Sequence, residues 1–184
     1  METLPDLLAP GMRVLSIGLN PSLPSVVAGF YFANPRNRFW KALNASQLLP
    51  APVQPGPDAM RLLLEREGIG FTDVVKRPTR GVADLRAADY REGAPRLYSL
   101  IETFRPGYAW FHGKVAFKQF VRHAGLENGE DVWGRQALTV GTTRFFVTPN
   151  PSPANAAYSL EALISWFNAL ADESGIHSSE DLTA

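Results

Sequence analysis

The stretch Arg13-Val14-Leu15-Ser16-Ile17-Gly18-Leu19-Asn20-Pro21-Ser22 decides the fold that the sequence predicts. Its aliphatic run, which ends at Ile17, has no helical spacing and is typical of a strand buried on both faces. Pro21 prevents the strand from continuing, so Asn20 is left at its carboxyl end. Open α/β sheets bind ligands at that edge. Asn-Pro also opens ordinary turns, and on these residues alone that alternative stays open.

A second stretch near the carboxyl terminus repeats this pattern, because the apolar run Thr143–Thr148 is followed by Asn150-Pro151-Ser152. Apolar spacing predicts further strands at 70–75, 108–112 and 136–140, and helices at 36–43, 58–67, 89–104, 115–123 and 160–170. Strands that alternate with helices predict a three-layer α/β/α sandwich around a mainly parallel sheet. The length of 184 residues predicts one domain, with a core from about 7 to 170 and a flexible tail from about 172.

Composition excludes several classes of protein. Eighteen basic residues balance 18 acidic ones, so a nucleic-acid partner has to be met by a local basic patch. Cysteine is absent and the three histidines share no metal-ligand spacing, so we expect neither a metal nor a cofactor. The sequence shows neither a signal-peptide pattern nor an apolar run of membrane-spanning length, which predicts a cytoplasmic protein that needs no membrane. We also expect no obligate protein partner.

The segment between the two Asn-Pro motifs holds aromatic and basic residues. The long loop 19–35 contains Phe30-Tyr31-Phe32, which either plugs the core or offers a stacking surface to a planar ligand such as a nucleobase. Arg36 and Arg38 lie near the start of the predicted helix 36–43, where cations oppose the helix dipole and suggest an anionic partner. The densest basic cluster follows the 70–75 strand and includes Lys76, Arg77 and Arg80, a local patch suited to phosphates.

A carboxylate stands out at the end of the same strand. Asp73 lies in an apolar run, where a charge is costly unless it is hydrogen-bonded or used in chemistry. It either caps the following turn or serves a ligand at the sheet edge. Asp84 is a rival on the next loop, and Asp89 is a weaker one.

These motifs together resemble the two active-site motifs of the uracil-DNA glycosylase superfamily. Gly18-Leu19-Asn20-Pro21-Ser22 is most similar to motif one of its mismatch-specific uracil-DNA glycosylase and thymine-DNA glycosylase branch, and Asn150-Pro151-Ser152 is similar to motif two. The segments 30–41, 76–79, 90–93, 112–114 and 133–134 follow in family order. The resemblance covers about residues 7 to 170.

The resemblance implies a monofunctional glycosylase that flips uracil, or a related damaged or mismatched base, out of DNA and hydrolyses its glycosidic bond in base excision repair. Asn20 matches the asparagine that positions water, Phe32 the ring that stacks on the base, and Asn150 the asparagine of motif two. Gly18, Leu19 and Ser25 complete the implied base pocket. The implied DNA contacts come from both motifs, the basic loop and the 112–114 turn: Ser22, Lys76, Arg77, Arg80, Lys114, Ser152, Pro153, Ala154 and Asn155.

The sequence departs from the family pattern at several positions. Asp73 stands where the family usually carries an amide or a lysine, and as a carboxylate it can take a proton from water, which an asparagine cannot. Ser22 replaces a glycine, and the small residues 153–157 replace the bulky wedge of the mismatch-specific relatives. Motif two also lacks the histidine of the classical uracil-DNA glycosylases, which disfavours membership of that branch. Two other functions stay open: a DNA-binding module without chemistry, and a nucleoside hydrolase.

Overall fold

The fold is built around a five-stranded sheet with the order β2-β1-β3-β5-β4. The computed structural model describes residues 3–127 and 129–175. The strands are β1 (Val14–Gly18), β2 (Ile69–Asp73), β3 (Tyr108–His112), β4 (Gly134–Val140) and β5 (Thr143–Thr148). All neighbouring strands pair in parallel except β4 and β5, which are antiparallel at one edge. The predicted α/β fold with a mainly parallel sheet is confirmed.

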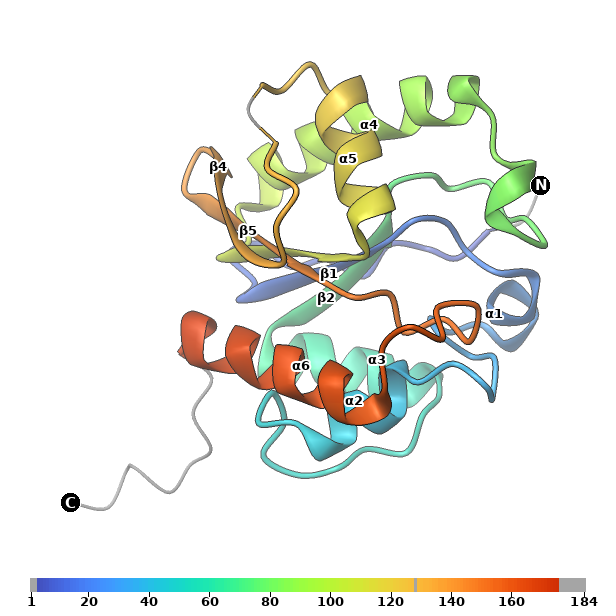
Figure 1. The fold of residues 1–184 in the computed structure, drawn as a ribbon. Coiled ribbons are helices and arrows are strands. Elements are labelled where there is room, and N and C mark those ends of the chain that lie inside the picture. Colours follow the sequence, from blue (N-terminus) through green and yellow to red (C-terminus); the bar gives the residue numbers. More distant parts are fainter. Residues whose placement is uncertain (1–2, 128, 176–184) are drawn as a thin grey trace.

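Helices cover both faces of this sheet, as Figure 1 shows. Helices α4 (Ala87–Phe104) and α5 (Lys114–His123) lie on one face. Helices α2 (Phe39–Ala45), α3 (Pro57–Leu62) and α6 (Leu160–Ser174) lie on the other. Side chains of β1 alternate between the two cores, with Leu15 and Ile17 facing α4 and α5, and Val14 facing the opposite layer.

Several element boundaries differ from the sequence prediction. The loop 19–35 contains a short helix, α1 (Leu23–Ala28), because Ser22 caps its amino end and Gly29 adopts the left-handed conformation at its carboxyl end. The helix predicted over 58–67 changes after Leu62 into a π-helical turn, η1 (Leu63–Glu67). Helix α4 continues through Pro95. A 3₁₀ turn, η2 (Val82–Asp84), lies in the basic loop.

The carboxyl-terminal helix is longer than predicted. Helix α6 ends at Ser174, where Gly175 accommodates the left-handed cap, so 172–174 are helical and do not belong to a tail. The rest of the predicted tail, 176–184, lies outside the described residues. Within the described part of the chain, no helix combines the length and the apolar character that crossing a bilayer requires.

Candidate active site

Three strand ends meet at the carboxyl edge of the sheet. Gly18 of β1 is the register partner of Asp73 of β2, and His112 ends β3 on the other side of β1. A Cβ atom at position 18 would collide with Asp73 Oδ1, so only glycine lets this carboxyl group lie against β1. The three ends line a cavity of about 330 Å³.

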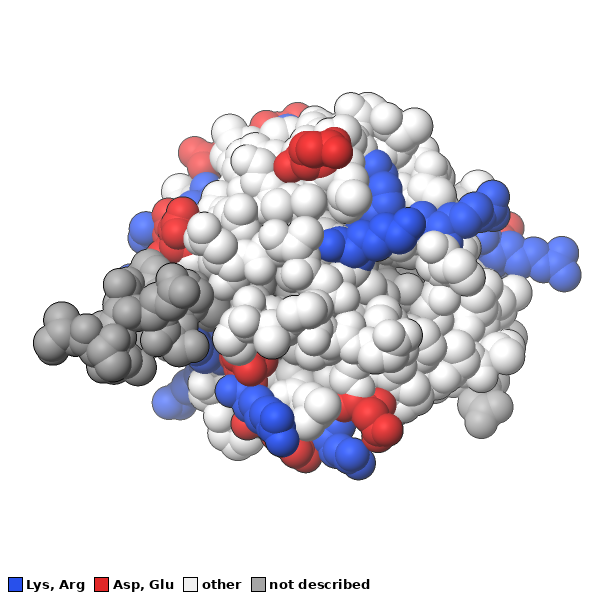
Figure 2. Space-filling model, turned by 90° about the horizontal axis from the view of Figure 1, so that it is seen from below, with Lys and Arg blue, Asp and Glu red and all other residues white. Residues whose placement is uncertain are grey.

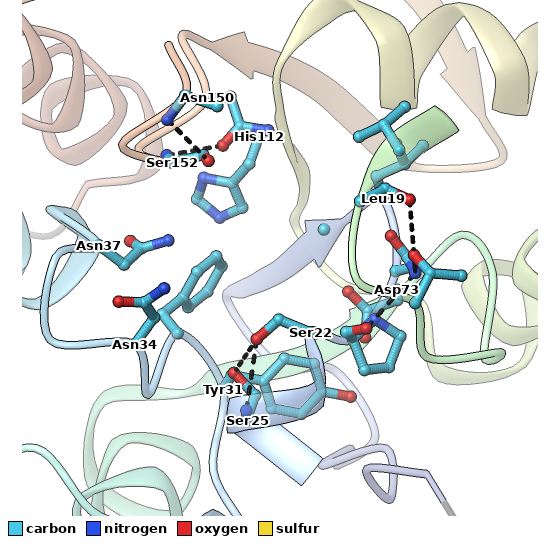
Figure 3. Close-up of a pocket in the computed structure, with 18 of the residues that line it drawn as sticks. Leu19, Ser22, Ser25, Tyr31, Asn34, Asn37, Asp73, His112, Asn150 and Ser152 are labelled. Carbon is cyan, nitrogen blue, oxygen red and sulfur yellow. Dashed lines mark hydrogen bonds between the residues drawn. The ribbon is translucent and has the colours of Figure 1, made fainter. Parts of the chain in front are cut away.

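The cavity brings together most of the residues predicted for the base pocket and its mouth (Figure 3). Those that line it are Gly18, Leu19, Asn20, Ser22, Ser25, Phe32, Asp73, Arg80, Asn150, Ser152, Pro153 and Ala154. Further lining residues that the sequence analysis did not assign to the site are Leu4, Asn34, Asn37, Thr79, Gly81, Val82 and His112, and Tyr31 of the aromatic loop also lines the cavity. Lys76, Arg77, Asp84, Lys114 and Asn155 are not among the lining residues.

The Asn20 amide has a defined orientation. Its Nδ2 donates to the carbonyl oxygen of Arg77 at 3.0 Å and to Thr79 Oγ1 at 2.8 Å. A carbonyl oxygen only accepts, so the nitrogen of the amide must face it. Oδ1 is therefore the amide atom left to a ligand, and it can accept a hydrogen bond from water.

Asp73 is a buried carboxyl group on the cavity wall. It is 3% exposed, and within the described residues its Oδ2 receives no hydrogen bond. Burial raises the pKa of Asp73 to about 7, against the pull of Lys76 and with a smaller push from Asp6. The alternative that Asp73 caps the following turn is wrong, because no backbone N–H of the described residues donates a hydrogen bond to its side chain. A carboxyl group with a pKa near neutrality can exchange protons at physiological pH.

Phe32 is held in a strained conformation at the same cavity. Its φ of 59° is in the left-handed region, which a bulky residue rarely adopts. One face of its ring stacks on Phe39 at a centroid distance of 4.0 Å, so the opposite face is available to a planar ligand. Both interpretations of the aromatic loop are therefore partly met, because Tyr31 is buried in the core whereas Phe32 also lines the cavity.

His112 forms part of the cavity wall as a neutral ring. It contacts Phe32 edge-to-face, and Ser16 Oγ lies 2.8 Å from its Nε2. Burial lowers the pKa of His112 to about 3, so the ring carries no charge at neutral pH. Its Nδ1 is buried and has no partner in the part of the chain that the structure describes.

Arg38 holds the loop of the second motif in place. Its guanidinium donates to the carbonyl oxygens of Ser152 at 3.1 Å and Asn155 at 2.8 Å, and also to that of Tyr158. The expectation that Arg38 awaits an anionic partner is wrong, because carbonyl oxygens already occupy its donors. Asn155 braces the same loop, since its Nδ2 donates to the carbonyl oxygen of Asn150.

The basic loop is largely engaged within the protein. Lys76 forms an ion pair of 2.8 Å with Asp6, and Arg77 one of 2.7 Å with Asp89. The hydrogen bond from Arg77 lowers the pKa of Asp89 to about 2. Arg80 is exposed at the cavity and has no ion pair within residues 3–127 and 129–175.

The predictions that Asp84 and Lys114 belong to the site also need correction, because neither residue lines the cavity. Asp84 is exposed outside the cavity, where its Oδ2 accepts from the backbone N–H of Gly81. Lys114 pairs with Asp131 at 3.0 Å and lies over the ring of Trp133. Figure 2 shows basic side chains in a row that runs from near the middle of the face seen from below to its right-hand border, whereas much of the rest of that face is uncharged. Basic residues therefore gather locally on this face.

The fold is an α/β fold with a cavity at the carboxyl edge of its mainly parallel sheet. Residues 5–171 match the family model of the Uracil DNA glycosylase superfamily, and the chain belongs to this superfamily. The solution NMR structure of a candidate uracil DNA glycosylase from Methanosarcina acetivorans is similar, with 20% identity and a TM-score of 0.59 over 92% of this chain and 97% of that chain. At this identity the likeness shows the fold alone, and the family match supports a DNA glycosylase that binds DNA.

Proposed function

We propose that this protein is a monofunctional DNA glycosylase that flips uracil, or a related damaged base, out of DNA and hydrolyses its glycosidic bond. One observation carries the proposal: the Asn20 Oδ1 acceptor, the Asp73 carboxyl group and the Phe32 ring line one cavity at the sheet edge. A base inside a duplex cannot reach such a cavity, so the nucleotide has to rotate out of the stack first. The abasic site that remains is the product.

Asn20 and Asp73 have different roles toward the attacking water. Asn20 Oδ1 accepts one hydrogen bond from the water and so positions its oxygen, but an amide has no useful basicity. Asp73 with a pKa of about 7 takes the proton. As the water oxygen bonds to the sugar C1′, the bond from C1′ to the base nitrogen breaks and the base leaves with the electron pair. The proton on Asp73 is then released to solvent.

The remaining residues have binding roles in this proposal. Phe32 stacks on the flipped base with the ring face that Phe39 leaves open. Ser22, Arg80, Ser152, Pro153 and Ala154 surround the cavity and contact the DNA backbone near the abasic sugar. With Lys76, Arg77 and Lys114 held in ion pairs, Arg80 is the cation that we assign to a phosphate.

We place the protein nearest the mismatch-specific and thymine-DNA glycosylase branch. Gly18-Leu19-Asn20-Pro21 supports this placement, whereas the small residues Pro153 and Ala154 at the cavity leave no bulky group to fill the space of the extruded base. We therefore expect little dependence on the base opposite the lesion. Excision from duplexes with guanine or adenine opposite uracil measures this dependence.

The test is cleavage of a uracil-containing oligonucleotide. After incubation with the protein, heating in alkali breaks the strand only where an abasic site has formed. Wild-type protein is expected to produce the break, and Asp73→Ala to slow it by about 10²–10⁴-fold, the usual contribution of a general base. Full excision by Asp73→Ala would remove Asp73 from the mechanism. Hydrolysis of free deoxyuridine instead of the oligonucleotide would indicate a nucleoside hydrolase, and DNA binding without any break a binding module.

A further inference from the structure

The segment before β1 brings a second carboxylate close to Asp73. Leu7 pairs with Phe71 of β2, and their backbones exchange two hydrogen bonds of 2.9 Å. This pairing places Asp6 beside the next residue of β2, Thr72, whose Oγ1 donates to Asp6 Oδ1 at 2.7 Å. Asp73 follows Thr72 directly, so Asp6 is bound to the chain neighbour of the proposed general base.

Asp6 binds two cations that lie near Asp73. Its Oδ1 accepts from Lys76 Nζ at 2.8 Å, and its Oδ2 accepts from Arg96 Nη1 at 2.8 Å. The other terminal nitrogen of Arg96 donates to the backbone carbonyl oxygen of Asp73 itself. Lys76 Nζ also donates to Tyr31 Oη at 3.1 Å, and Tyr31 lines the cavity together with Asp73. Asp6 is not among the cavity residues, so it can act on the site only through its neighbours.

The side chain of Asp73 stays unpaired although these cations are close. In the described part of the chain it takes part in no ion pair, and its Oδ2 receives no hydrogen bond. A buried carboxylate gains from a cation within reach, because the pair offsets the cost of removing the charge from water. Asp6 competes for the same cations at a lower cost, since its side chain is 21% exposed whereas Asp73 is 3% exposed.

The charge around Asp73 therefore depends on Asp6. Burial is the main cause of the raised pKa of Asp73; Lys76 lowers this pKa, Asp6 raises it and Arg96 lowers it. Burial also raises the pKa of Tyr31, so its hydroxyl stays protonated and uncharged at neutral pH. The ionisable groups around Asp73 are Asp6 of the segment before β1, Tyr31 of the loop after α1, Lys76 and Arg80 of the loop after β2, Arg96 of α4 and the neutral His112 of β3.

We propose that Asp6 is a positioning residue for the glycosylase reaction, because its carboxylate holds Lys76 and Arg96 and so keeps both cations from pairing with Asp73. The inference rests on the proposed function, since it concerns the general base of that same reaction. A cation bonded to Asp73 would stabilise its carboxylate, and a stabilised carboxylate takes a proton from water poorly. With the cations held by Asp6, the unpaired carboxyl group keeps the proton affinity that a general base needs at neutral pH.

The first readout is a ¹³C NMR titration of the Asp73 carboxyl carbon, whose signal is identified by its loss in Asp73→Asn. Asp6→Asn removes the charge that holds Lys76, so the midpoint of Asp73 is expected to move to lower pH by about 1–3 pH units, the usual effect of a cation beside a carboxylate. Asp6→Glu keeps the carboxylate and is expected to keep the midpoint close to that of the wild type. Asp58→Asn is the matched control, because it removes the same charge from an exposed ion pair with Arg61 outside the cavity, and the midpoint stays unchanged.

The second readout is the pH profile of single-turnover uracil excision. With a midpoint near pH 7, the wild-type rate is expected to rise about 100-fold from pH 5 to pH 8 as Asp73 ionises. In Asp6→Asn this rise is expected to fall to about 10-fold or less, because Asp73 is ionised over more of the range. Loosening of the segment before β1 would instead lower the rate by the same factor at every pH. An unchanged Asp73 midpoint in Asp6→Asn would overturn the proposal.

A second variant tests the same idea if Asp6→Asn does not fold. Lys76→Met leaves Asp6 without this partner, so the negative charge of Asp6 acts more strongly on Asp73 and the midpoint is expected to move to higher pH. A midpoint that does not move in Lys76→Met would overturn the proposal.

Failure of the proposed function gives a different result. If the wild-type protein excises no uracil, that function is refuted. The NMR titration needs no turnover, so it still decides whether Asp6 keeps the cations from Asp73.

Discussion

Replacing Asp73 by asparagine is expected to stabilise the protein at alkaline pH. The same substitution removes the proposed general base. The unfolded carboxyl group ionises near pH 3.8 and the folded one near pH 7. Between these values the folded protein holds a proton that the unfolded chain has released, so wild-type stability falls as the pH rises. The difference between these two pKa values corresponds to about 4 kcal/mol in all, and to about 3 kcal/mol above pH 5. The asparagine side chain of the Asp73→Asn variant does not titrate, so the variant does not lose this stability as the pH rises.

Urea unfolding of the wild type and Asp73→Asn at pH 5 and pH 8.5 measures the effect. The stability of the variant relative to the wild type is expected to rise by about 3 kcal/mol between the two pH values. Asp89→Asn is the matched control, because Asp89 has a pKa of about 2 in the folded protein and its pH dependence lies below this window. Stability differences for Asp73→Asn that stay constant from pH 5 to 8.5 would refute a folded-state pKa near 7, and with it the reasoning from burial.

Three other substitutions test the site. Asn20→Ala is expected to slow uracil excision by about 10²–10³-fold in single-turnover assays, because the attacking water loses its acceptor; an unchanged rate would count against the role of Asn20. Gly18→Ala places a methyl group against Asp73 Oδ1 and is expected to cost about 1–3 kcal/mol in urea unfolding, whereas Gly56→Ala, where the added Cβ meets open space, is the neutral comparison. Arg38→Ala removes the donors to the 152–158 carbonyl oxygens and is expected to cost about 2–4 kcal/mol and to speed hydrogen exchange of that segment; unchanged exchange there would contradict its bracing role.

The sequence predicts the sheet and its ligand edge well because both depend on local signals. The apolar runs predicted at 13–17, 70–75 and 143–148 correspond to β1, β2 and β5, which end at Gly18, Asp73 and Thr148. Their carboxyl ends meet in space because parallel strands share an edge. Asn20, Phe32, Asp73 and Asn150 could therefore be expected at one cavity from the sequence.

The charged residues were the harder part of the prediction. A sequence shows that Lys76 and Arg77 are basic, but not that Asp6 and Asp89 lie within ion-pair distance of them. The separation of 70 residues between Lys76 and Asp6 carries no periodic signal. The polarity of the amides is hidden for the same reason, since the orientation of Asn20 depends on carbonyl and hydroxyl groups 57 and 59 residues away.

The contacts of Arg38 have a consequence for how the protein folds. They join segments 114 and 117 residues apart in the chain, so closing them requires the ordering of nearly the whole domain between them. Contacts of such long range form slowly and depend on earlier structure. We expect the cavity to be completed late in folding, after the sheet, and a chain that lacks its last strand and helix to lack the wall that residues 150–154 form.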